Sequence, residues 1–516
     1  MTTTSAYRAY ARDHGGRVLL LLLLFSLALY SFVTAGFSAF AVVCISPILV
    51  LVVLAAFRYR MFTFWALMGI NYFIQWKSFP VQGIPTSLPN EMLELVLLAL
   101  AVIDVKDAKF ERTANIMLVA LAAWAGFCTL EMLNNTSDLG YQIGAWYGGA
   151  RMMAYQLLYA FLVYILYITT PKMLINYLYV WAALSLFAVF WVWKQQKFGL
   201  TQMENSFLQG RGRTTHLLQG GTLIRYFSIY SDAANFGIGI AATAVAFLIF
   251  GITSKIRKHR IFFLFTGLAC VWATFPSGTR TATFCIIAGV AAYVFLSKSF
   301  KIAIPVCIVG GLAVFILAFT TIGNGNQSIR RMRTAFDKND ASSNQRTINQ
   351  AVMKKYLQDA PFGLGIGMGY ENVPANNKYR KLATIPPDSE YVFIWIHTGV
   401  VGITVFLITT AIMLIGACWI VFFTIKSPSL RGIGSGFCCA FVSIQLGGYG
   451  NQVLMQFPNC LLFYGGLSLV YILPIIESEW NAYEEEQLAK EAEKKRLKLE
   501  RKKAKRVDSP FHFFSW

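Results

Sequence analysis

Residues 391–424 read YVFIWIHTGVVGITVFLITTAIMLIGACWIVFFT and contain no Asp, Glu, Lys or Arg. Comparable apolar runs of about 17 to 25 residues recur along the chain, and each is long enough for an α-helix to cross a bilayer. Of the 516 residues, 56% are hydrophobic and 14% are charged, whereas a soluble domain carries about 25% charged residues. The sequence therefore predicts an all-α polytopic membrane protein. Unbroken runs of this kind are not the alternating segments of a transmembrane β-barrel.

Hydropathy predicts about 12–14 transmembrane helices. The fourteen candidate spans are residues 18–35, 38–57, 61–76, 91–104, 115–132, 152–169, 173–193, 235–253, 260–276, 281–297, 301–322, 391–424, 432–448 and 455–476. We expect the long run 391–424 to break near Gly399 and Gly402.

Basic residues lie on alternate loops between these spans, which indicates their orientation because cytoplasmic loops are rich in Lys and Arg. The basic loops contain Arg58 and Arg60, Lys106 and Arg112, Lys172, Lys255 to Arg260, Lys298 and Lys301, and Lys426 and Arg431. An even number of spans then places both termini in the cytoplasm, with the protein in the inner (cytoplasmic) membrane of a bacterium. Residues 1–476 are predicted to form a transmembrane domain, and residues 477–516 a charged cytoplasmic tail. The net charge of +20 is assigned to these loops and the tail, not to nucleic-acid binding.

Two long loops, residues 194–234 and 323–390, are expected on the outer face. The second contains PFGLGIGMGY (361–370), with a glycine at every second position. Its spacing is not the G-x-G-x-x-G of a dinucleotide site, no strand is evident before it, and the outer face is the wrong compartment for ATP or NAD. Two interpretations remain for Gly365, Gly367 and their neighbours: a tight turn against neighbouring helices, or contact with a lipid pyrophosphate or sugar.

Cysteine and histidine spacing does not indicate a metal site. The nine cysteines fall almost entirely within apolar runs, and the five histidines are scattered, so the cysteines are interpreted as small buried hydrophobes. We expect neither a metal nor another cofactor.

Arginines on the outer loops are not needed for topology. They are Arg211, Arg213 and Arg225 on the first long loop, Arg280 at the outer end of a span, and Arg346 on the second long loop. An arginine at the membrane edge is costly unless it is paired, and its planar group binds phosphate bidentately. Their number suggests a site for a lipid-linked phosphate or pyrophosphate, the alternative being snorkelling to lipid headgroups.

Four motifs, in order, resemble those of the O-antigen ligase and polymerase superfamily of bacterial membrane glycosyltransferases. They are IRYFSIYSDAANFGIGIA (224–241), in which Arg225 and Asn235 match R-x-x-G-x-F-x-x-P-N-x-F-A; SGTRTA (277–282), which resembles T-x-S-R-x-A and gives Arg280; RTINQAVMKKYLQDAPFGLGIGMGY (346–370), which resembles R-x-x-x-W…P-x-x-G-x-G-x-G; and DSEYVFIWIHTGVVG (388–402), which resembles H-N-x-Y-L-x-x-x-x-x-T-G-x-x-G. The first motif lacks the usual Gly and Pro. The resemblance covers residues 224 to 402, and the first 200 residues resemble the family only as a set of hydrophobic helices.

This resemblance implies a GT-C-like enzyme that transfers a glycan from an undecaprenyl-diphosphate carrier to an acceptor outside the cytoplasmic membrane, without a metal or nucleotide sugar. The leaving group is then a lipid pyrophosphate, and fixed guanidinium groups would stabilise its developing charge. We expect Arg225, Arg280 and Arg346 to bind the pyrophosphate, with Arg280 also contributing to catalysis. Arg211 and Arg213 are secondary candidates.

The acceptor hydroxyl needs a base or an orienting partner. Where ligases of this family often have His-Asn, this chain has Asp388 and Ser389. Asp388 and Glu390 are the candidates for this role, the alternative being solvated residues at headgroup level. His397 is a further candidate, although a buried, hydrogen-bonded histidine is the simpler interpretation.

Arg346 opens a predicted amphipathic helix at about residues 345–358. Ile348, Val352 and Tyr356 are spaced i, i+4 and i+8, so they are expected to form an apolar face on the outer membrane interface. Such a helix would cap the lipid site.

The function favoured by the sequence is polymerisation of surface polysaccharide repeat units, because the His-Asn typical of ligases is missing. Ligation of the glycan to lipid A–core or another acceptor is the alternative within the family. A polysaccharide transporter or flippase is the alternative of another class, but it would place charged residues near the bilayer midplane.

Overall fold

The computed structural model divides into two compact units, Met1–Ala66 and Leu67–Trp516. In the first unit it describes residues 15–16, 19–20, 22–27, 29–34, 54–55 and 58–66, and in the second residues 67–77, 87–104, 109–218, 223–325, 327–333 and 341–507. The first unit contributes an apolar helix at Leu22–Thr34. All that follows concerns the second unit and α3, the helix in which it begins.

The described residues are almost entirely helical. The first helices are α3 (Arg60–Phe73), α4 (Leu88–Ile103), α5 (Ile116–Leu130), α6 (Ile143–Ala150), α7 (Gln156–Tyr167) and α8 (Pro171–Phe198), with single turns at Phe110–Thr113, Glu131–Leu133 and Arg151–Tyr155. Next come α9 (Gln202–Gln209), α10 (Arg213–His216) and an antiparallel pair of strands, β1 (Leu217–Leu218) and β2 (Leu223–Ile224). The second half contains α11 (Ala233–Thr253), α12 (Arg257–Thr274), α13 (Arg280–Leu296), α14 (Phe300–Phe319), α15 (Gln327–Arg333), α16 (Ala341–Leu357), α17 (Arg380–Thr384), α18 (Glu390–Trp419), a π-helical turn at Ile420–Thr424, α19 (Pro428–Gly450), α20 (Asn459–Val470) and α21 (Glu477–Val507).

These helices confirm the predicted all-α polytopic membrane fold. A helix coincides with each of the predicted spans except residues 38–57, which lie almost wholly outside the described part of the chain. Among the described residues, six helical segments are long and apolar enough to cross a membrane: Ile116–Leu133, Ile143–Tyr167, Pro171–Phe198, Ala233–Thr253, Glu390–Thr424 and Pro428–Gly450. The remaining predicted spans coincide with shorter or more polar helices, except residues 301–322, which coincide with the 20-residue apolar helix α14.

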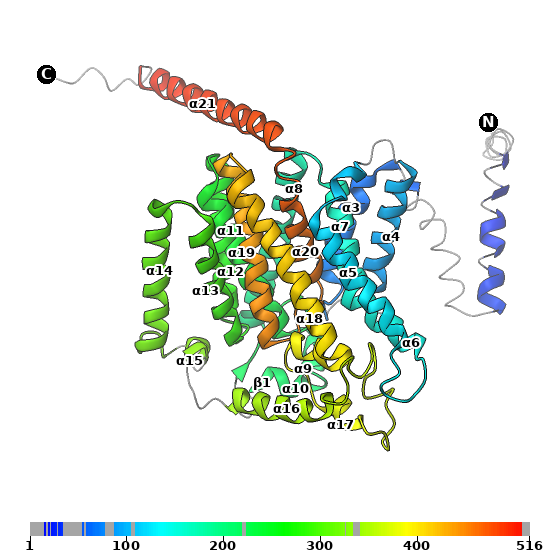
Figure 1. The fold of residues 1–516 in the computed structure, drawn as a ribbon. Helices are drawn as coiled ribbons and strands as arrows, with labels where there is room; N and C mark the ends of the chain where they lie inside the picture. Colours follow the sequence, from blue (N-terminus) through cyan, green and yellow to red (C-terminus); the bar gives the residue numbers. More distant parts are fainter. Residues whose placement is uncertain are drawn as a thin grey trace. The chain divides into compact units, whose positions relative to one another are not determined.

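Helices α11 and α19 form the centre of the bundle and are the most completely buried of these segments. They pack against each other, and both contact α13 (Figure 1). Small residues allow this close approach, as is usual between helices in membranes. A Cβ added at Gly447 of α19, for example, would lie 2.2 Å from the Ile238 side chain of α11.

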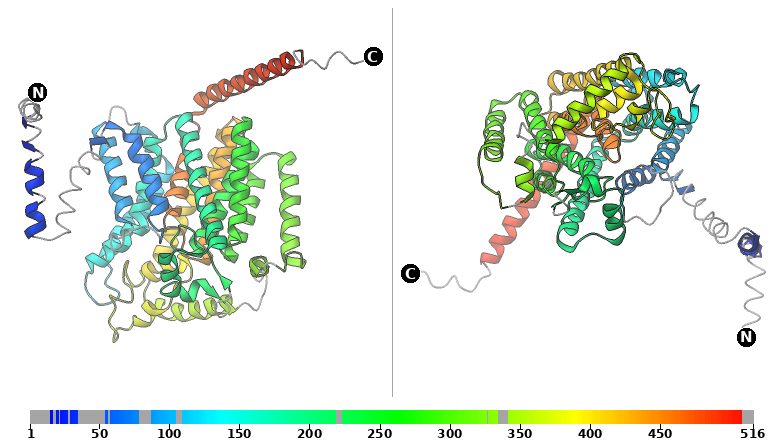
Figure 2. Two further views of the ribbon diagram at one scale, coloured as in Figure 1. Left: turned by 180° about the vertical axis from the view of Figure 1, so that it is seen from behind. Right: turned by 90° about the horizontal axis from the view of Figure 1, so that it is seen from below.

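The loops gather at opposite ends of the bundle, as the alternation of charge predicts. At one end the tail helix α21 contacts two basic loops, through Lys255 with Glu484 (2.7 Å) and through Trp480 with Ser429 (3.0 Å). At the other end lie α9, α10, the strands, α16 and α17, which belong to the two predicted outer loops (Figures 1 and 2). The candidate site is built at this second end, which we call the loop end.

Helix α18 is broken at Gly399, as expected from the sequence, with φ 65° and ψ −167° at that residue. A break inside a membrane helix leaves backbone groups that lipid cannot satisfy. The glycine-rich loop supplies the partners: Leu364 N donates to Ile396 O at 2.8 Å, and Val401 N donates to Pro361 O at 3.2 Å. The loop therefore completes the hydrogen bonding of a discontinuous helix.

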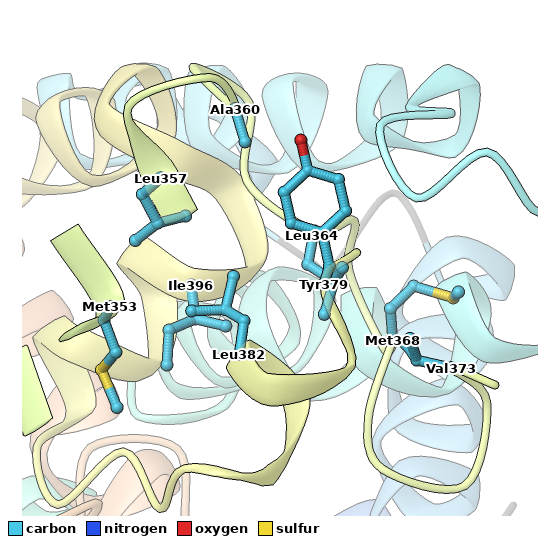
Figure 3. Close-up of a cluster of buried hydrophobic side chains, with 9 residues drawn as sticks. All are labelled: Met353, Leu357, Ala360, Leu364, Met368, Val373, Tyr379, Leu382 and Ile396. Atoms are coloured by element: carbon cyan, nitrogen blue, oxygen red, sulfur yellow. The ribbon is translucent and has the colours of Figure 1, made fainter. Parts of the chain in front are cut away.

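The glycines of this loop are required by close backbone packing. Gly365 and Gly367 have φ values of +102° and +79°, and a Cβ added at Gly367 would lie 1.8 Å from Ala145 O of α6. The loop also buries Leu364 and Met368 in an apolar cluster at the loop end (Figure 3). Of the two interpretations of this motif, the tight turn against neighbouring helices describes what the loop does here.

Helix α16 forms where the amphipathic helix was predicted, and Tyr356 of the predicted apolar face packs against the apolar cluster. Met353 and Leu357 pack into the apolar cluster (Figure 3), whereas Ile348, expected on the apolar face, is 58% exposed. Met353 and Leu357 follow Arg346 by seven and eleven positions, so the three residues lie on one side of the helix. The predicted apolar face is partly buried, and its place at a membrane interface stays a prediction.

Candidate active site

Arg225 lies at the loop end, directly after β2, and its guanidinium is held by hydrogen bonds. Its Nε donates to Ser277 O (3.2 Å), one Nη to Thr215 O (2.9 Å) and the other Nη to Thr279 Oγ1 (2.9 Å). Two of these partners belong to the turn before α13, so the first and second sequence motifs meet here. Three fixed bonds to neutral oxygens orient the group without neutralising its charge.

A cavity of about 410 Å³ opens beside Arg225. Its walls come from three separate parts of the chain: the loop from α9 to α11, the segment before α18, and the segment between α19 and α20. The lining residues are Phe207, Thr215, His216, Arg225, Asp232, Ala233, Ala234, Pro386, Pro387, Asp388, Asn451, Gln452 and Gln456. We call this space the cationic cavity after Arg225, and its lining also contains the carboxylates of Asp232 and Asp388.

Arg280 and Arg346 are close enough to Arg225 to affect its ionisation. Burial lowers the pKa of Arg225; the Asp232 carboxylate opposes this effect, and the charges of Arg280 and Arg346 lower the pKa further. Like charges in a partly buried site repel one another unless an anion lies among them. The arrangement therefore suits an anionic ligand such as a phosphate or pyrophosphate.

Arg346 reaches this region from α16. One of its Nη atoms donates to Gly450 O at 2.9 Å, while its buried Nε has no hydrogen-bond partner among the described residues. A buried N–H without a partner costs free energy, and an anion in the cavity region would supply an acceptor. Arg346 is thus held by a hydrogen bond from one Nη, while its Nε has an unused N–H donor.

Arg331 was not singled out from the sequence. Its Nε donates to Gly278 O at 2.7 Å, and a Cβ added at Gly278 would lie within 3.2 Å of Arg331 and 3.3 Å of Arg225. The two arginines therefore flank one glycine in the turn before α13. The only available signal was the basic run of α15, QSIRRMR, and hydropathy gave no reason to place it beside that turn.

Two titratable residues that line the cavity are already engaged in structural bonds. Asp232 caps α11, accepting hydrogen bonds from Ala234 N (2.8 Å) and Asn235 N (2.9 Å). His216 accepts from Ala233 N at Nε2 (3.1 Å), so the neutral ring carries its proton on Nδ1, 3.1 Å from Gly212 O. Burial lowers the pKa of His216 to about 4, against the charge of Asp232, which leaves this histidine neutral and its basic nitrogen occupied.

Asp388 is the remaining carboxylate at the cavity. It is exposed, and within the described residues no hydrogen bond or ion pair engages its carboxylate. The residues on both sides of it are nevertheless held, since Gln452 Nε2 donates to Pro387 O (2.8 Å) and Ser389 Oγ donates to Gly448 O (3.1 Å). Asp388 therefore lies between two anchored residues, and its carboxylate has no protein partner within the described residues.

The other predicted site residues lie outside this cavity. Glu390 is 3% exposed and accepts a hydrogen bond from Leu454 N at 2.9 Å, and His397 is buried with Nδ1 2.9 Å from Phe393 O. Arg211 is exposed and its charge acts on the neighbouring Lys77, while Arg213 lines a separate, larger hollow. Their roles in catalysis or binding stay predictions.

Part of the chain is similar to a known protein family. Residues 262–407 match the family model described as O-antigen ligase. The match confirms the resemblance to the O-antigen ligase and polymerase superfamily. A search of curated proteins found no match for the chain.

The region that matches the family model supplies part of the site. Arg280, Arg331, Arg346 and Asp388 fall inside the matched residues, whereas Arg225 lies before them. The cavity is completed by residues 451 to 456, which follow the matched region. Segments on both sides of the matched region are therefore needed to enclose the space.

Proposed function

We propose that the protein transfers a glycan from a polyprenyl-diphosphate carrier, undecaprenyl diphosphate in bacteria, to a hydroxyl of an acceptor. The observation that carries the proposal is the cationic cavity itself: it is lined by Arg225 and by the unengaged carboxylate of Asp388, and the charges of Arg280 and Arg346 act on Arg225. The match of residues 262–407 to the O-antigen ligase family supports glycan transfer. The cavity offers the charges that such a transfer from a lipid diphosphate needs.

The arginines bind the diphosphate and stabilise the leaving group. The bond between the anomeric carbon and the diphosphate oxygen breaks, and that oxygen takes the bonding electrons. Arg225, Arg280 and Arg346 are already positioned, so they stabilise this charge without reorganising. No step in this scheme requires a metal or a nucleotide.

Asp388 acts as the general base. The acceptor hydroxyl attacks the anomeric carbon, a glycosidic bond forms, and the hydroxyl proton passes to the Asp388 carboxylate. The products are the extended glycan, a protonated Asp388 and the polyprenyl diphosphate. Glu390, fixed to the backbone of residue 454, acts as a positioning residue beneath this site.

Lipid-linked glycans place this chemistry at a bilayer surface. We propose that the loop end faces outward from the bacterial inner membrane, with both termini in the cytoplasm, because the loops at the opposite end are basic. The amphipathic helix α16 and the cavity would then lie at the outer interface, where the carrier diphosphate resides.

Polymerisation of surface polysaccharide repeat units is the favoured reaction, because Asp388 and Ser389 stand where ligases of the superfamily often have His-Asn. The description of the matched family favours ligation to lipid A–core or another acceptor as the second candidate.

A deletion strain examined on a polysaccharide gel separates these functions. A polymerase deletion leaves one repeat unit attached and removes longer chains. A ligase deletion removes attachment entirely and lets lipid-linked polymer accumulate. Normal surface glycan in the deletion strain would contradict both.

A further inference from the structure

A second, larger hollow of about 820 Å³ lies beside the cationic cavity at the loop end. It is formed by the end of α8, by α9, by α10 and by the strands that follow. Its lining residues are Gln195, Gln196, Gly199, Leu200, Asn205, Leu208, Gln209, Arg213, Thr214, Leu217, Ile224 and Tyr226. We call it the polar hollow.

One thin wall separates the polar hollow from the cationic cavity. Along the extended chain at β2, Ile224 and Tyr226 line the polar hollow and Arg225 lines the cationic cavity, as expected for side chains that alternate along a strand. In α10, Thr214 lines the polar hollow and Thr215 lines the cationic cavity. A substrate bound by Arg225 therefore lies next to the polar hollow, with only this segment between them.

The polar hollow presents hydrogen-bonding groups that the protein does not use. Within the described residues, no side-chain hydrogen bond engages the amides of Gln196, Asn205 and Gln209 or the hydroxyl of Tyr226. Arg213 is the one charged residue of the lining, and no carboxylate is present. Amides and hydroxyls can each both donate and accept, which matches the closely spaced hydroxyls of a sugar.

The wall that carries these groups is rigidly built. Glu204 is fully buried and accepts hydrogen bonds from Trp191 Nε1 (2.7 Å), Gln195 Nε2 (3.0 Å) and Thr201 N (2.9 Å). This carboxylate joins the end of α8 to the start of α9 and holds α9 in one orientation. Asn205 and Gln209, spaced i and i+4 on α9, consequently face the hollow together.

We propose that the polar hollow binds sugar residues of the glycan substrate, away from the bond that is broken. This inference rests on the proposed function and assigns it an oligosaccharide subsite. A pocket of this size accommodates a ligand larger than a single sugar. The amides and the Tyr226 hydroxyl form hydrogen bonds with the sugar hydroxyls, and these bonds select the glycan. The arginines bind the diphosphate, which is the same in every lipid-linked donor.

Binding of a phosphate-free oligosaccharide to the full-length protein in detergent tests the proposal. The probe is the oligosaccharide released by mild acid from the host's own lipid-linked glycan, and the readout is the dissociation constant from calorimetry. The Asn205→Ala/Gln209→Ala variant should weaken binding at least tenfold, about 1.4 kcal/mol. Gln202→Ala, at an exposed residue of α9 that does not line the hollow, should bind like the wild type.

Tyr226→Phe removes one hydroxyl without altering the wall and should weaken binding about threefold to tenfold, which keeps the test valid if the double variant unfolds. Wild-type affinity in these variants, or no binding to the wild type, would overturn the proposal. The probe lacks phosphate, so its binding is measured apart from the diphosphate site. A transfer assay on Arg225→Ala judges the proposed function separately, so the two failures are distinguishable.

Discussion

At the residue scale, one carboxylate of the site makes no hydrogen bond within the described residues, whereas two others form structural hydrogen bonds. Asp232 caps a helix, Glu390 holds the backbone at Leu454, and Asp388 alone faces the cationic cavity without a partner among the described residues. The chemical role and the structural role are thus assigned to different carboxylates, although Asp388 and Glu390 are only two positions apart.

Asp388→Asn should slow glycan transfer about 10²-fold to 10⁴-fold, because the amide cannot accept the hydroxyl proton. Its melting temperature should not change, since the carboxylate makes no structural bond. Glu390→Gln should instead lower the melting temperature, because the oxygen that accepts from Leu454 N loses its charge. The transfer rate and the melting temperature of both variants test these expectations. A wild-type transfer rate in Asp388→Asn would show that Asp388 is not the general base.

His216 makes the stability of the cavity wall dependent on pH. Its pKa is about 4 in the folded protein and 6.5 when unfolded, so between these values the unfolded chain binds the proton that the folded one does not. The contribution to stability is therefore present above pH 6.5 and is lost as the pH falls toward 4. The neighbouring charge of Asp232 opposes this lowering of the pKa, and those of Arg225 and Lys77 add to it.

His216→Gln should show a smaller fall in melting temperature between pH 7 and pH 5 than the wild type. Glutamine retains an acceptor for Ala233 N but has no titratable group. Thermal unfolding of the purified protein at both pH values measures the difference. An identical fall in both proteins would show that His216 does not titrate as described.

The individual residues of the site were only partly predictable. Arg225, Arg280 and Arg346 could be chosen because each lies at a span edge within a recognisable motif. Arg331 and Gln452 could not, because their relevance depends on contacts with turns more than 50 residues away. Hydropathy and motif order do not contain such tertiary contacts.

At the element scale, the broken helix α18 and the glycine-rich loop form one structure. The loop fills backbone positions that the break at Gly399 leaves open. The sequence indicated both the break and the tight turn. It did not indicate that the loop hydrogen-bonds to the broken helix, because the bonded residues lie about 30 to 40 positions apart along the chain.

Gly367 and Gly369 form a matched pair that tests this structural role. Gly367→Ala should lose about 1–3 kcal/mol of stability because its φ is positive, and its Cβ would also meet Ala145 O at 1.8 Å. Gly369→Ala should be tolerated, since nothing lies within 4 Å of an added Cβ. Melting temperature and membrane yield compare the two, and equal loss in both variants would contradict the packing explanation.

At the scale of the whole molecule, charge alternation and tertiary structure agree. Hydropathy predicted the helices well, since long apolar runs have few alternatives in a membrane, and the loops sort to two ends as expected. On α16, Ile348 is exposed whereas Tyr356 is packed, because burial there depends on the apolar cluster of residues 353 to 396 and not on the helix alone.

Single-cysteine labelling tests the orientation of the bundle. In a cysteine-free background, Lys381→Cys at the loop end should react with a membrane-impermeant maleimide in intact spheroplasts. Lys498→Cys on α21 should react only after permeabilisation; both native side chains are exposed. The opposite pattern would place the cationic cavity in the cytoplasm and exclude the proposed outer reaction.

The central claim is that fixed arginines stabilise a lipid diphosphate leaving group. The most direct test reconstitutes the purified protein in liposomes with a polyprenyl-diphosphate-linked glycan and measures release of polyprenyl diphosphate. Arg225→Ala and Arg225→Lys should each reduce the rate about 10²-fold, while Arg496→Ala on α21 should match the wild type. Release at the wild-type rate by Arg225→Ala would contradict the account.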